Sequence, residues 1–226
     1  MMRSTASKTY SSWCRAMIDQ DFLKQQWIEA RERLAARGLL PSGQGALSVR
    51  CSGRATMWLG GGADTEPRLV SWDSADGAAE VHALVYRERD DVGAVAWSGG
   101  AFGVRLIHFG GALPQLFDEQ ARHIGAALVA VEPRAALRNA LATVSNVFLV
   151  SGMPLCLGTT PRRLALNMEL FEKCAKAYVL AAAAGGRVRT LPWWVRRIAN
   201  GRLAKDERAA AEAFRRGELP AESKSY

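Results

Sequence analysis

The side chains best suited to acid–base or metal chemistry are few and scattered. The chain has only three histidines, His82, His108 and His123. His82 lies in a predicted helix with Glu80, and these two residues could move protons if both reached one cleft. A structural histidine that makes a buried hydrogen bond is the alternative interpretation of His82. A metal site could form from four residues further along the chain: His108, Asp118, Glu119 and His123.

The four cysteines do not extend this set of candidates. They are Cys14, Cys51, Cys156 and Cys174, and no two of them form a C-x-x-C pair. Zinc binding by cysteine in small sites usually depends on such paired spacing. We therefore expect reduced thiols and no zinc held by these residues.

Two other patterns could bind an anion. A predicted strand ends in Gly60-Gly61-Gly62, whose backbone N–H groups could face a phosphate, although a flexible turn would use the same residues. Near the C-terminus, Trp193 and Trp194 lie among arginines, which suits an anionic ligand, an anionic membrane surface or a protein contact. The alternative is that both tryptophans pack this segment onto the body of the protein or onto a neighbouring subunit.

Composition indicates an ordinary globular protein. The chain has 226 residues, of which 49% are hydrophobic, and this suits one sizeable domain. The net charge of +8 would permit nucleic-acid binding, but most arginines are dispersed, so we do not expect it. The apolar run 175–184 contains Lys176 and is far shorter than the roughly 20 residues of a membrane span. With no apolar stretch after the N-terminus to suggest a secretory signal, we expect a cytoplasmic protein without a transmembrane segment.

Hydrophobic periodicity predicts an irregular alternation of helices and strands. Helices are expected at 19–38, 78–89, 117–131 with Asp118 as N-cap, 135–142 and 161–184. Strands are expected at 46–51, 55–59, 69–72, 92–97, 146–150 and 154–157. This order predicts an α/β protein, a three-layer α/β/α sandwich with a mixed, partly antiparallel sheet. We assign residues 1–18 to a flexible lead-in, 19–192 to the main domain and 193–226 to a basic, partly helical tail.

Four stretches, taken together and in order, resemble the class II aldolase/adducin family. Gly45-Ala-Leu-Ser-Val-Arg50 is similar to the family's Gly-Asn-x-Ser-x-Arg, and His82 to Tyr86 followed by Asp91 is similar to its His-x-x-x-Tyr helix and metal strand. The other two stretches are Phe117-Asp-Glu-Gln120 and Phe148-Leu-Val-Ser-Gly-Met153 with the later Gly158-Thr-Thr160. The resemblance covers roughly residues 20–192. It implies a fuculose-phosphate-aldolase-like domain with a mainly antiparallel sheet, usually assembled as a tetramer with sites at subunit contacts.

The resemblance also implies where a metal would be bound. Active members hold zinc with three histidines, two of them in His-x-His on one strand, where alternate side chains share a side. At the matching positions this chain has Trp97, Gly99 and Gly152, and none of these supplies a zinc ligand. The family's catalytic glutamate falls on Ala78, or on Glu80 after a shift in alignment. We therefore expect no metal cofactor.

The sequence thus favours a metal-free, degenerate class II aldolase/adducin-like protein that acts as a binding, scaffolding or regulatory homo-oligomer. The alternative is an aldolase-like lyase that acts on a small carbonyl or sugar-acid substrate through an altered, non-zinc site. In that case Glu80 and His82 are the expected catalytic residues, with Arg105 as a further candidate. A small anionic or carbonyl ligand would contact residues around the inherited cleft: Ser48, Gly61, Trp97, Ser98, Gly99 and Gly152.

Overall fold

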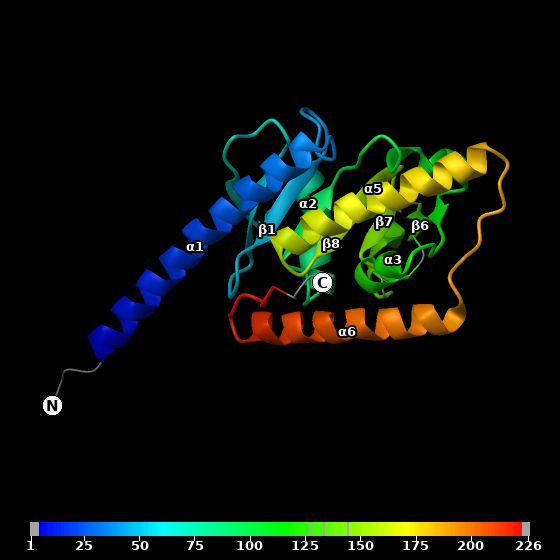
Figure 1. Cartoon of the computed structure of the whole chain (residues 1–226). Helices are drawn as coiled ribbons and strands as arrows, with labels where there is room; N and C mark the ends of the chain where they lie inside the picture. Colours follow the sequence, from blue (N-terminus) through cyan, green and yellow to red (C-terminus); the bar gives the residue numbers. More distant parts are fainter. Residues whose placement is uncertain (1–4, 127, 133, 144, 223–226) are drawn as a thin grey trace.

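A mixed sheet of eight strands forms the middle of the molecule (Figure 1). The computed structural model describes residues 5–126, 128–132, 134–143 and 145–222. The strand order is β3-β2-β1-β4-β8-β7-β6-β5, and only the β6–β7 pair among these is parallel. The strands are β1 (Ala46–Arg50), β2 (Thr56–Gly60), β3 (Arg68–Ser71), β4 (Ala94–Trp97), β5 (Ala112–Leu113), β6 (Leu128–Val131), β7 (Val147–Val150) and β8 (Met153–Gly158). The predicted α/β class and mainly antiparallel sheet are confirmed.

Helices cover both faces of this sheet and complete three layers. They are α1 (Thr5–Ala36), α2 (Gly77–Glu88), η1 (Val104–Phe109), α3 (Asp118–His123), η2 (Arg134–Ala136), α4 (Leu137–Leu141), α5 (Pro161–Ala183) and α6 (Trp193–Arg215). α1 and α5 pack on one face, whereas α2 and α4 pack on the other. α1 begins at Thr5, upstream of the start that the periodicity predicted at Asp19. No helix in the described part of the chain is both long enough and apolar enough to cross a membrane.

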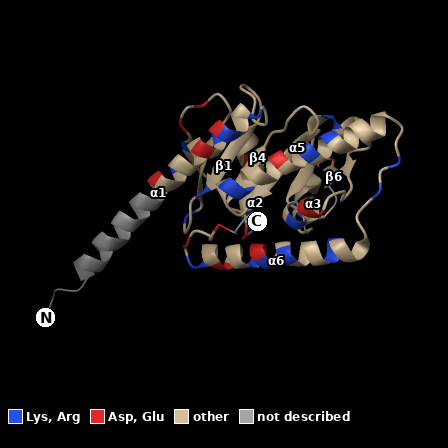
Figure 2. Ribbon diagram, in the orientation of Figure 1, with Lys and Arg blue, Asp and Glu red and all other residues tan. Residues whose placement is uncertain are grey.

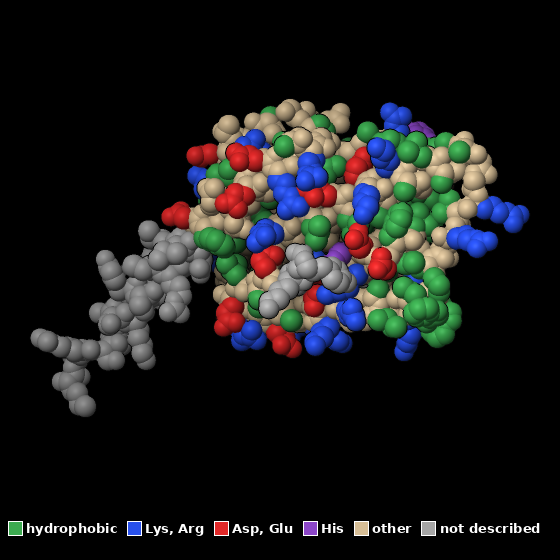
Figure 3. Space-filling model, in the orientation of Figure 1, with side chains coloured by type: hydrophobic (Ala, Val, Ile, Leu, Met, Phe, Trp, Pro, Cys, Tyr) green, Lys and Arg blue, Asp and Glu red, His purple; other side chains and the backbone are tan. Residues whose placement is uncertain are grey.

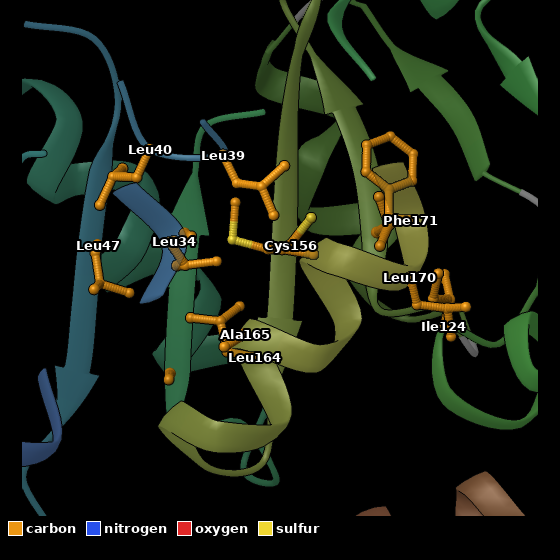
Figure 4. Packing of buried hydrophobic residues seen from close by; sticks show 14 of the residues in the cluster. Leu34, Leu39, Leu40, Leu47, Ile124, Cys156, Leu164, Ala165, Leu170 and Phe171 are labelled. Atoms are coloured by element: carbon orange, nitrogen blue, oxygen red, sulfur yellow. The ribbon is translucent and has the colours of Figure 1, made fainter. Parts of the chain in front are cut away.

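The larger core lies between the sheet and the α1–α5 layer. Alternate strand residues such as Leu47 and Cys156 point to this side and belong to one buried cluster with Leu164 and Phe171 of α5 (Figure 4). Trp27 of α1 is fully buried here, and its indole N–H donates to the Leu47 carbonyl at 2.9 Å. A buried indole satisfied in this way fixes α1 against β1.

The intervening strand residues build a second core under α2 and α4. Val95 and Leu155 face Val81 and Val85 of α2, and Trp97 packs at the edge of the same cluster. The period-two alternation of the strands therefore sorts their side chains between two cores. As a result, Trp97 lies on the α2 side of the sheet.

The region between α3 and β6 differs from the sequence-based expectation. A helix was predicted from residue 117 to about 131 with Asp118 as its N-cap, and both predictions are wrong. Phe117 is the N-cap, and α3 ends at His123. Gly125 has a φ of 88°, a left-handed conformation that suits glycine and stops the helix. The apolar run that follows becomes β6, because it pairs in parallel with β7 through Ala130 and Leu149.

α6 is attached to the body through polar contacts. Arg122 of α3 donates to Asp206 at 2.6 Å, and Glu207 accepts from Asn146 at 2.9 Å and from Arg89 at 3.3 Å. Acidic residues, Asp206, Glu207 and Glu212, lie among the basic residues of this helix, and both kinds of charge are distributed over the other elements as well (Figure 2). The positive net charge is therefore not concentrated on the C-terminal segment alone.

Candidate functional site

The strand register brings most of the predicted site residues to one end of the sheet. Ala46 pairs with Trp97, Leu47 pairs with Gly60, and Trp97 pairs with Leu155. The starts of β1 and β8 and the ends of β2 and β4 therefore lie together, and we call this region the Trp97 end. It holds five of the predicted residues, Gly61, Trp97, Ser98, Gly99 and Gly152, while Ser48 is the middle residue of β1.

The backbone and side chain of the segment after Trp97 are tied to neighbouring elements. The Ser98 N–H donates to the Pro154 carbonyl at 2.9 Å, and its hydroxyl donates to the Leu39 carbonyl at 3.0 Å. Gly99 packs so closely on the next strand that an added Cβ would lie 2.6 Å from Cγ of Pro154. No side chain therefore fits at position 99 without a local shift. The N–H and the hydroxyl of Ser98 are already hydrogen-bonded within the protein.

The two other glycines of the predicted site have structural roles in turns. Ser151 and Gly152 have φ values of 51° and 76° and join β7 to β8, since Val150 pairs with Met153. Two consecutive positive φ angles are the geometry of a tight two-residue hairpin. The Gly61 N–H donates to the Asp64 carboxylate at 2.7 Å, so a side chain of the same loop occupies the amide that was expected to face a ligand.

His82 belongs to a buried hydrogen-bonded group. The Ser48 hydroxyl lies 2.7 Å from Nδ1 of His82 and 2.8 Å from the Tyr86 hydroxyl, and all three side chains are buried. Burial lowers the pKa of His82 to about 3 and raises the pKa of Tyr86, so both are neutral at pH 7. Nε2 of His82 is also buried, without a hydrogen-bond partner. The geometry matches the structural interpretation of His82, with Ser48 linking α2 to β1.

Glu80 does not share this environment. It is exposed on α2 and lines a surface depression with Leu84, Arg87 and Arg138. Residues that are two apart on a helix lie about 200° apart around its axis, so Glu80 and His82 face different sides. The structure does not bring these two predicted catalytic residues together.

The other candidate polar residues also lie apart from the Trp97 end. Arg105 is exposed, and its Nε donates to the Ala101 carbonyl at 3.0 Å. Nδ1 of His123 is 2.8 Å from the Arg163 guanidinium, and burial together with that cation lowers the pKa of His123 to about 4. Within the described ranges, no three His, Cys, Asp or Glu side chains are grouped so that they could hold a metal ion. The alternative site that combined His108 and His123 is therefore not formed.

Sequence reasoning missed the role of Glu172, which comes from α5. Its carboxylate accepts from the Phe102 N–H at 2.7 Å and from the Gly103 N–H at 2.9 Å. A Cβ at Gly100 would meet this carboxyl group at 2.6 Å. The glycine cluster after Trp97 therefore makes room for an anion that the protein itself supplies. In the sequence, the spacing of the glycines indicated a tight turn after Trp97. Its partner, Glu172, lies far along the chain and could not be identified from that spacing.

The two tryptophans of the basic segment are largely exposed. Trp193 and Trp194 keep 68% and 56% of their surface, and Ile198 beside them keeps 56%. Hydrophobic side chains accordingly gather on the surface where α6 begins (Figure 3). Packing of these indoles onto the body of the same chain, one of the two expectations, is therefore wrong.

The residues at the Trp97 end do not fit a zinc ion. Zinc needs imidazole, thiolate or carboxylate ligands in a tetrahedral arrangement. Trp97 offers an indole, the close contact between Gly99 and Pro154 leaves no room for an imidazole, and Gly152 is part of a hairpin turn. No step of a reaction can be assigned to a metal held at these positions.

Comparisons with known proteins bear on the fold. A scan of family models and a search of curated proteins found no match. Among solved structures, an L-fuculose 1-phosphate aldolase superposes with a TM-score of 0.69 at 18% identity, covering 80% of this chain and 96% of that one. The L-fuculose 1-phosphate aldolase from Glaciozyma antarctica PI12 gives 0.66 at 18% identity, with coverages of 88% and 92%. An aldolase II superfamily protein from Pseudomonas syringae gives 0.62 at 13% identity, with coverages of 88% and 95%. The chain thus has the fold of the class II aldolase superfamily.

Proposed function

We propose that this chain is a metal-independent protein on the class II aldolase fold, which acts as a binding or regulatory oligomer. The contact between Gly99 and Pro154 is the observation that carries the proposal. In the His-x-His pattern of the resembled family, position 99 would hold the second imidazole. Here the ring of Pro154 lies 2.6 Å from the place of a Cβ, so the adjacent strand fills the space that such a ligand would need.

The neighbouring polar groups support the same conclusion. Glu172 fills the turn after β4, Asp64 binds the Gly61 N–H, and Ser98 bonds to two backbone carbonyls. Hydrogen-bonding groups that are already paired would have to break those bonds before they could bind a substrate. This arrangement favours a structural use of the Trp97 end over catalysis there.

The alternative is a lyase with an altered, non-zinc site, and the experiment must distinguish it from the proposed function. It would need His82 to exchange protons with a substrate, whereas burial keeps His82 neutral and bonded to Ser48. It would also need Glu80, which faces away from that group.

The test is the metal content of the purified protein, measured together with aldol cleavage of a panel of sugar phosphates and sugar acids. We expect far less than one zinc per chain, and no cleavage after zinc is added. The matched control is Trp97→His with Gly99→His and Pro154→Ala, which supplies the His-x-His pair and removes the obstructing ring. Stoichiometric zinc in the wild type, with activity lost on chelation, would refute the proposal.

The tetramer is an expectation from the family resemblance and needs its own measurement. Light scattering coupled to size-exclusion chromatography gives the mass in solution. We expect a multiple of the 24.5 kDa chain mass, with four copies as the family value. A monomer at all concentrations would remove the oligomer from the proposal and leave the metal-independent part untouched.

A further inference from the structure

A cavity lies at the opposite end of the sheet from Trp97. β1 runs from Ala46, which pairs with Trp97, to Arg50, whose N–H donates to the Gly93 carbonyl at 2.8 Å. At about 3.3 Å per residue, these two ends of β1 are roughly 13 Å apart. We call the second region the Arg50 end, formed by Arg50, Gly93 and Thr159. The cavity there has a volume of about 390 Å³.

The walls of this cavity are mostly apolar and come from distant parts of the chain. α1, β1, the end of α6 and the segment after it contribute the main apolar side chains: Phe22, Leu23, Val49, Phe214, Leu219 and Pro220. A space of this size between apolar walls suits a small organic molecule. The lining therefore indicates a ligand with a hydrophobic portion.

Arg50 is one of two arginines, with Arg162, that line the cavity. Its guanidinium lies 4.7 Å from the centre of the Phe214 ring and 5.2 Å from that of Trp72, and Nη1 donates to the Asp90 carbonyl at 3.2 Å. Cation–π contacts on two rings hold the planar group in one orientation. Burial lowers the pKa of Arg50, but an arginine remains charged at neutral pH.

The two nearby carboxylates pair with other arginines. Asp91 binds Arg89 at 2.7 Å, and Asp90 lies 3.7 Å from Arg215. In the part of the chain that the structure describes, no carboxylate forms an ion pair with Arg50. Asp90 and Asp91 still attract the Arg50 guanidinium through space, but neither carboxylate is in salt-bridge contact with it. A ligand carboxylate could make that direct, charge-assisted contact with a guanidinium that has already lost part of its hydration.

The charge balance around the cavity favours a monoanion. Arg162 lines the cavity on the α5 side, and the first turn of that helix adds a partial positive charge. Glu222 also lines it and would repel a highly charged ligand such as a sugar phosphate or nucleotide. We propose that the cavity binds a small apolar monocarboxylate, whose carboxylate pairs with Arg50 and whose hydrophobic part lies between α1 and the segment 214–220.

This site is separate from the Trp97 end and does not depend on the metal-independent function proposed above. It shares no residue with the predicted catalytic and substrate-binding set. Zinc at the Trp97 end would therefore leave the monocarboxylate proposal standing, and failure to bind a carboxylate would leave the metal question open.

The experiment uses the full chain and octanoate as the probe, with octanamide as a neutral molecule of the same shape. Binding is measured by titration calorimetry and by ligand-detected NMR. We expect saturable octanoate binding and an affinity for octanamide that is lower by roughly ten- to a hundredfold, because the amide lacks the charge-assisted bond to Arg50. Inorganic phosphate should not compete.

Three variants locate the site. Arg50→Gln should lower octanoate affinity by roughly tenfold or more and remove most of the preference over octanamide. Arg54→Gln, an exposed arginine just after β1, is the charge-matched control and should bind like the wild type. Leu219→Trp keeps Arg50 but fills the cavity, so it should abolish binding even if Arg50→Gln fails to fold.

Three results would overturn the proposal. The first is equal affinity for octanoate and octanamide, which would mean that no cation recognises the carboxylate. The second is undiminished octanoate binding by a folded Arg50→Gln protein or by Leu219→Trp. The third is the absence of saturable binding in the wild type.

Discussion

The two ends of the central sheet differ in how their polar groups are paired. At the Trp97 end, Ser98, Glu172 and the Gly61 N–H all bond to partners within the protein. At the Arg50 end, a charged guanidinium borders an apolar cavity and its nearest carboxylates pair with other cations. The positions that match the family's metal ligands thus lie where the structure is closed. The cavity lies at the other end, where Arg50 and Thr160 belong to stretches that also match the family pattern.

A match to a family motif therefore locates a fold more reliably than it locates a ligand. At Gly45, Gly99 and Gly100 of the Trp97 end, neighbouring atoms leave no room for a Cβ, and Gly45 also has a φ of 79°. Packing and backbone conformation account for glycine at these positions without a ligand. The cavity at the Arg50 end is formed instead by contacts between α1, β1 and the C-terminal segment, which the matched stretches alone do not reveal.

The largest expected effect comes from the ion-pair network around Arg89, which lies at the same end of the sheet as Arg50. Arg89 donates to Asp91 at 2.7 and 2.8 Å and also to Asn146 and Glu207, thereby connecting α2, β4, β7 and α6. Arg89→Met should lower the free energy of unfolding by about 3–5 kcal/mol, because it leaves buried carboxylates without a cation. Chemical denaturation measures this change.

The matched control for that network is an exposed ion pair. Arg138 lies 2.8 Å from Glu88, and 66% of its side chain is exposed. Arg138→Met should change the free energy of unfolding by less than about 1 kcal/mol. If both substitutions had the same small effect, the network would not be what holds α6 to the body.

The second prediction concerns pH and the buried side of α2. His82 has a pKa of about 3 in the folded protein against an ordinary value of 6.5. Below pH 6.5 the unfolded chain takes up a proton that the folded protein does not, so stability falls as the pH drops from 6.5 toward 3. This residue alone should remove about 2 kcal/mol between pH 8 and pH 5.

His82→Asn tests that assignment through the slope of stability against pH. The variant should lose less stability on acidification than the wild type does, whatever its stability at pH 8. The pKa of His123 is also lowered, to about 4, and this histidine contributes to the slope in both proteins. Parallel pH profiles for the wild type and the variant would show that His82 is accessible to protons in the folded state.

The third prediction tests whether packing explains glycine at position 99. Gly99→Ala should cost about 1–3 kcal/mol, because its Cβ would overlap the Pro154 ring, and thermal or chemical unfolding measures the loss. In a Pro154→Ala background the same substitution should cost much less, which a double-mutant cycle detects. An equal cost in both backgrounds would place the strain in the backbone and contradict the argument from packing.

The sequence predicted the sandwich because its signals are local. The short continuous apolar runs of β4 and β8 and the Thr160-Pro161 start of α5 are sufficient to place those elements. The Asp118 helix was predicted too long, because apolar residues after Gly125 fit a helix as well as a strand until β7 is available as a partner. Local periodicity cannot distinguish these outcomes.

The candidate sites were harder to predict because they depend on contacts between distant segments. Gly99 meets Pro154, Glu172 reaches Phe102, and Arg50 meets Phe214. Each contact joins residues that are far apart in the chain, so neither the closure of the Trp97 end nor the cavity at the Arg50 end follows from spacing. The sequence did indicate the unusual residues, Trp97 and Gly99, but not the side chains that surround them.

The smallest effect should come from the helix cap at the Arg50 end. The Thr160 hydroxyl accepts from the Arg163 N–H at 3.1 Å, so Thr160→Ala should cost about 1 kcal/mol in thermal unfolding, whereas Thr160→Ser keeps the acceptor and should cost less. Octanoate affinity should change little in either variant, since this hydroxyl already caps α5 and Arg50 provides the charge. If Thr160→Ala folded with only the expected small loss of stability but no longer bound octanoate, the start of α5 rather than Arg50 would be the anion-binding element. The Arg50 end would then differ from the Trp97 end through a helix terminus that binds anions, and not through a guanidinium.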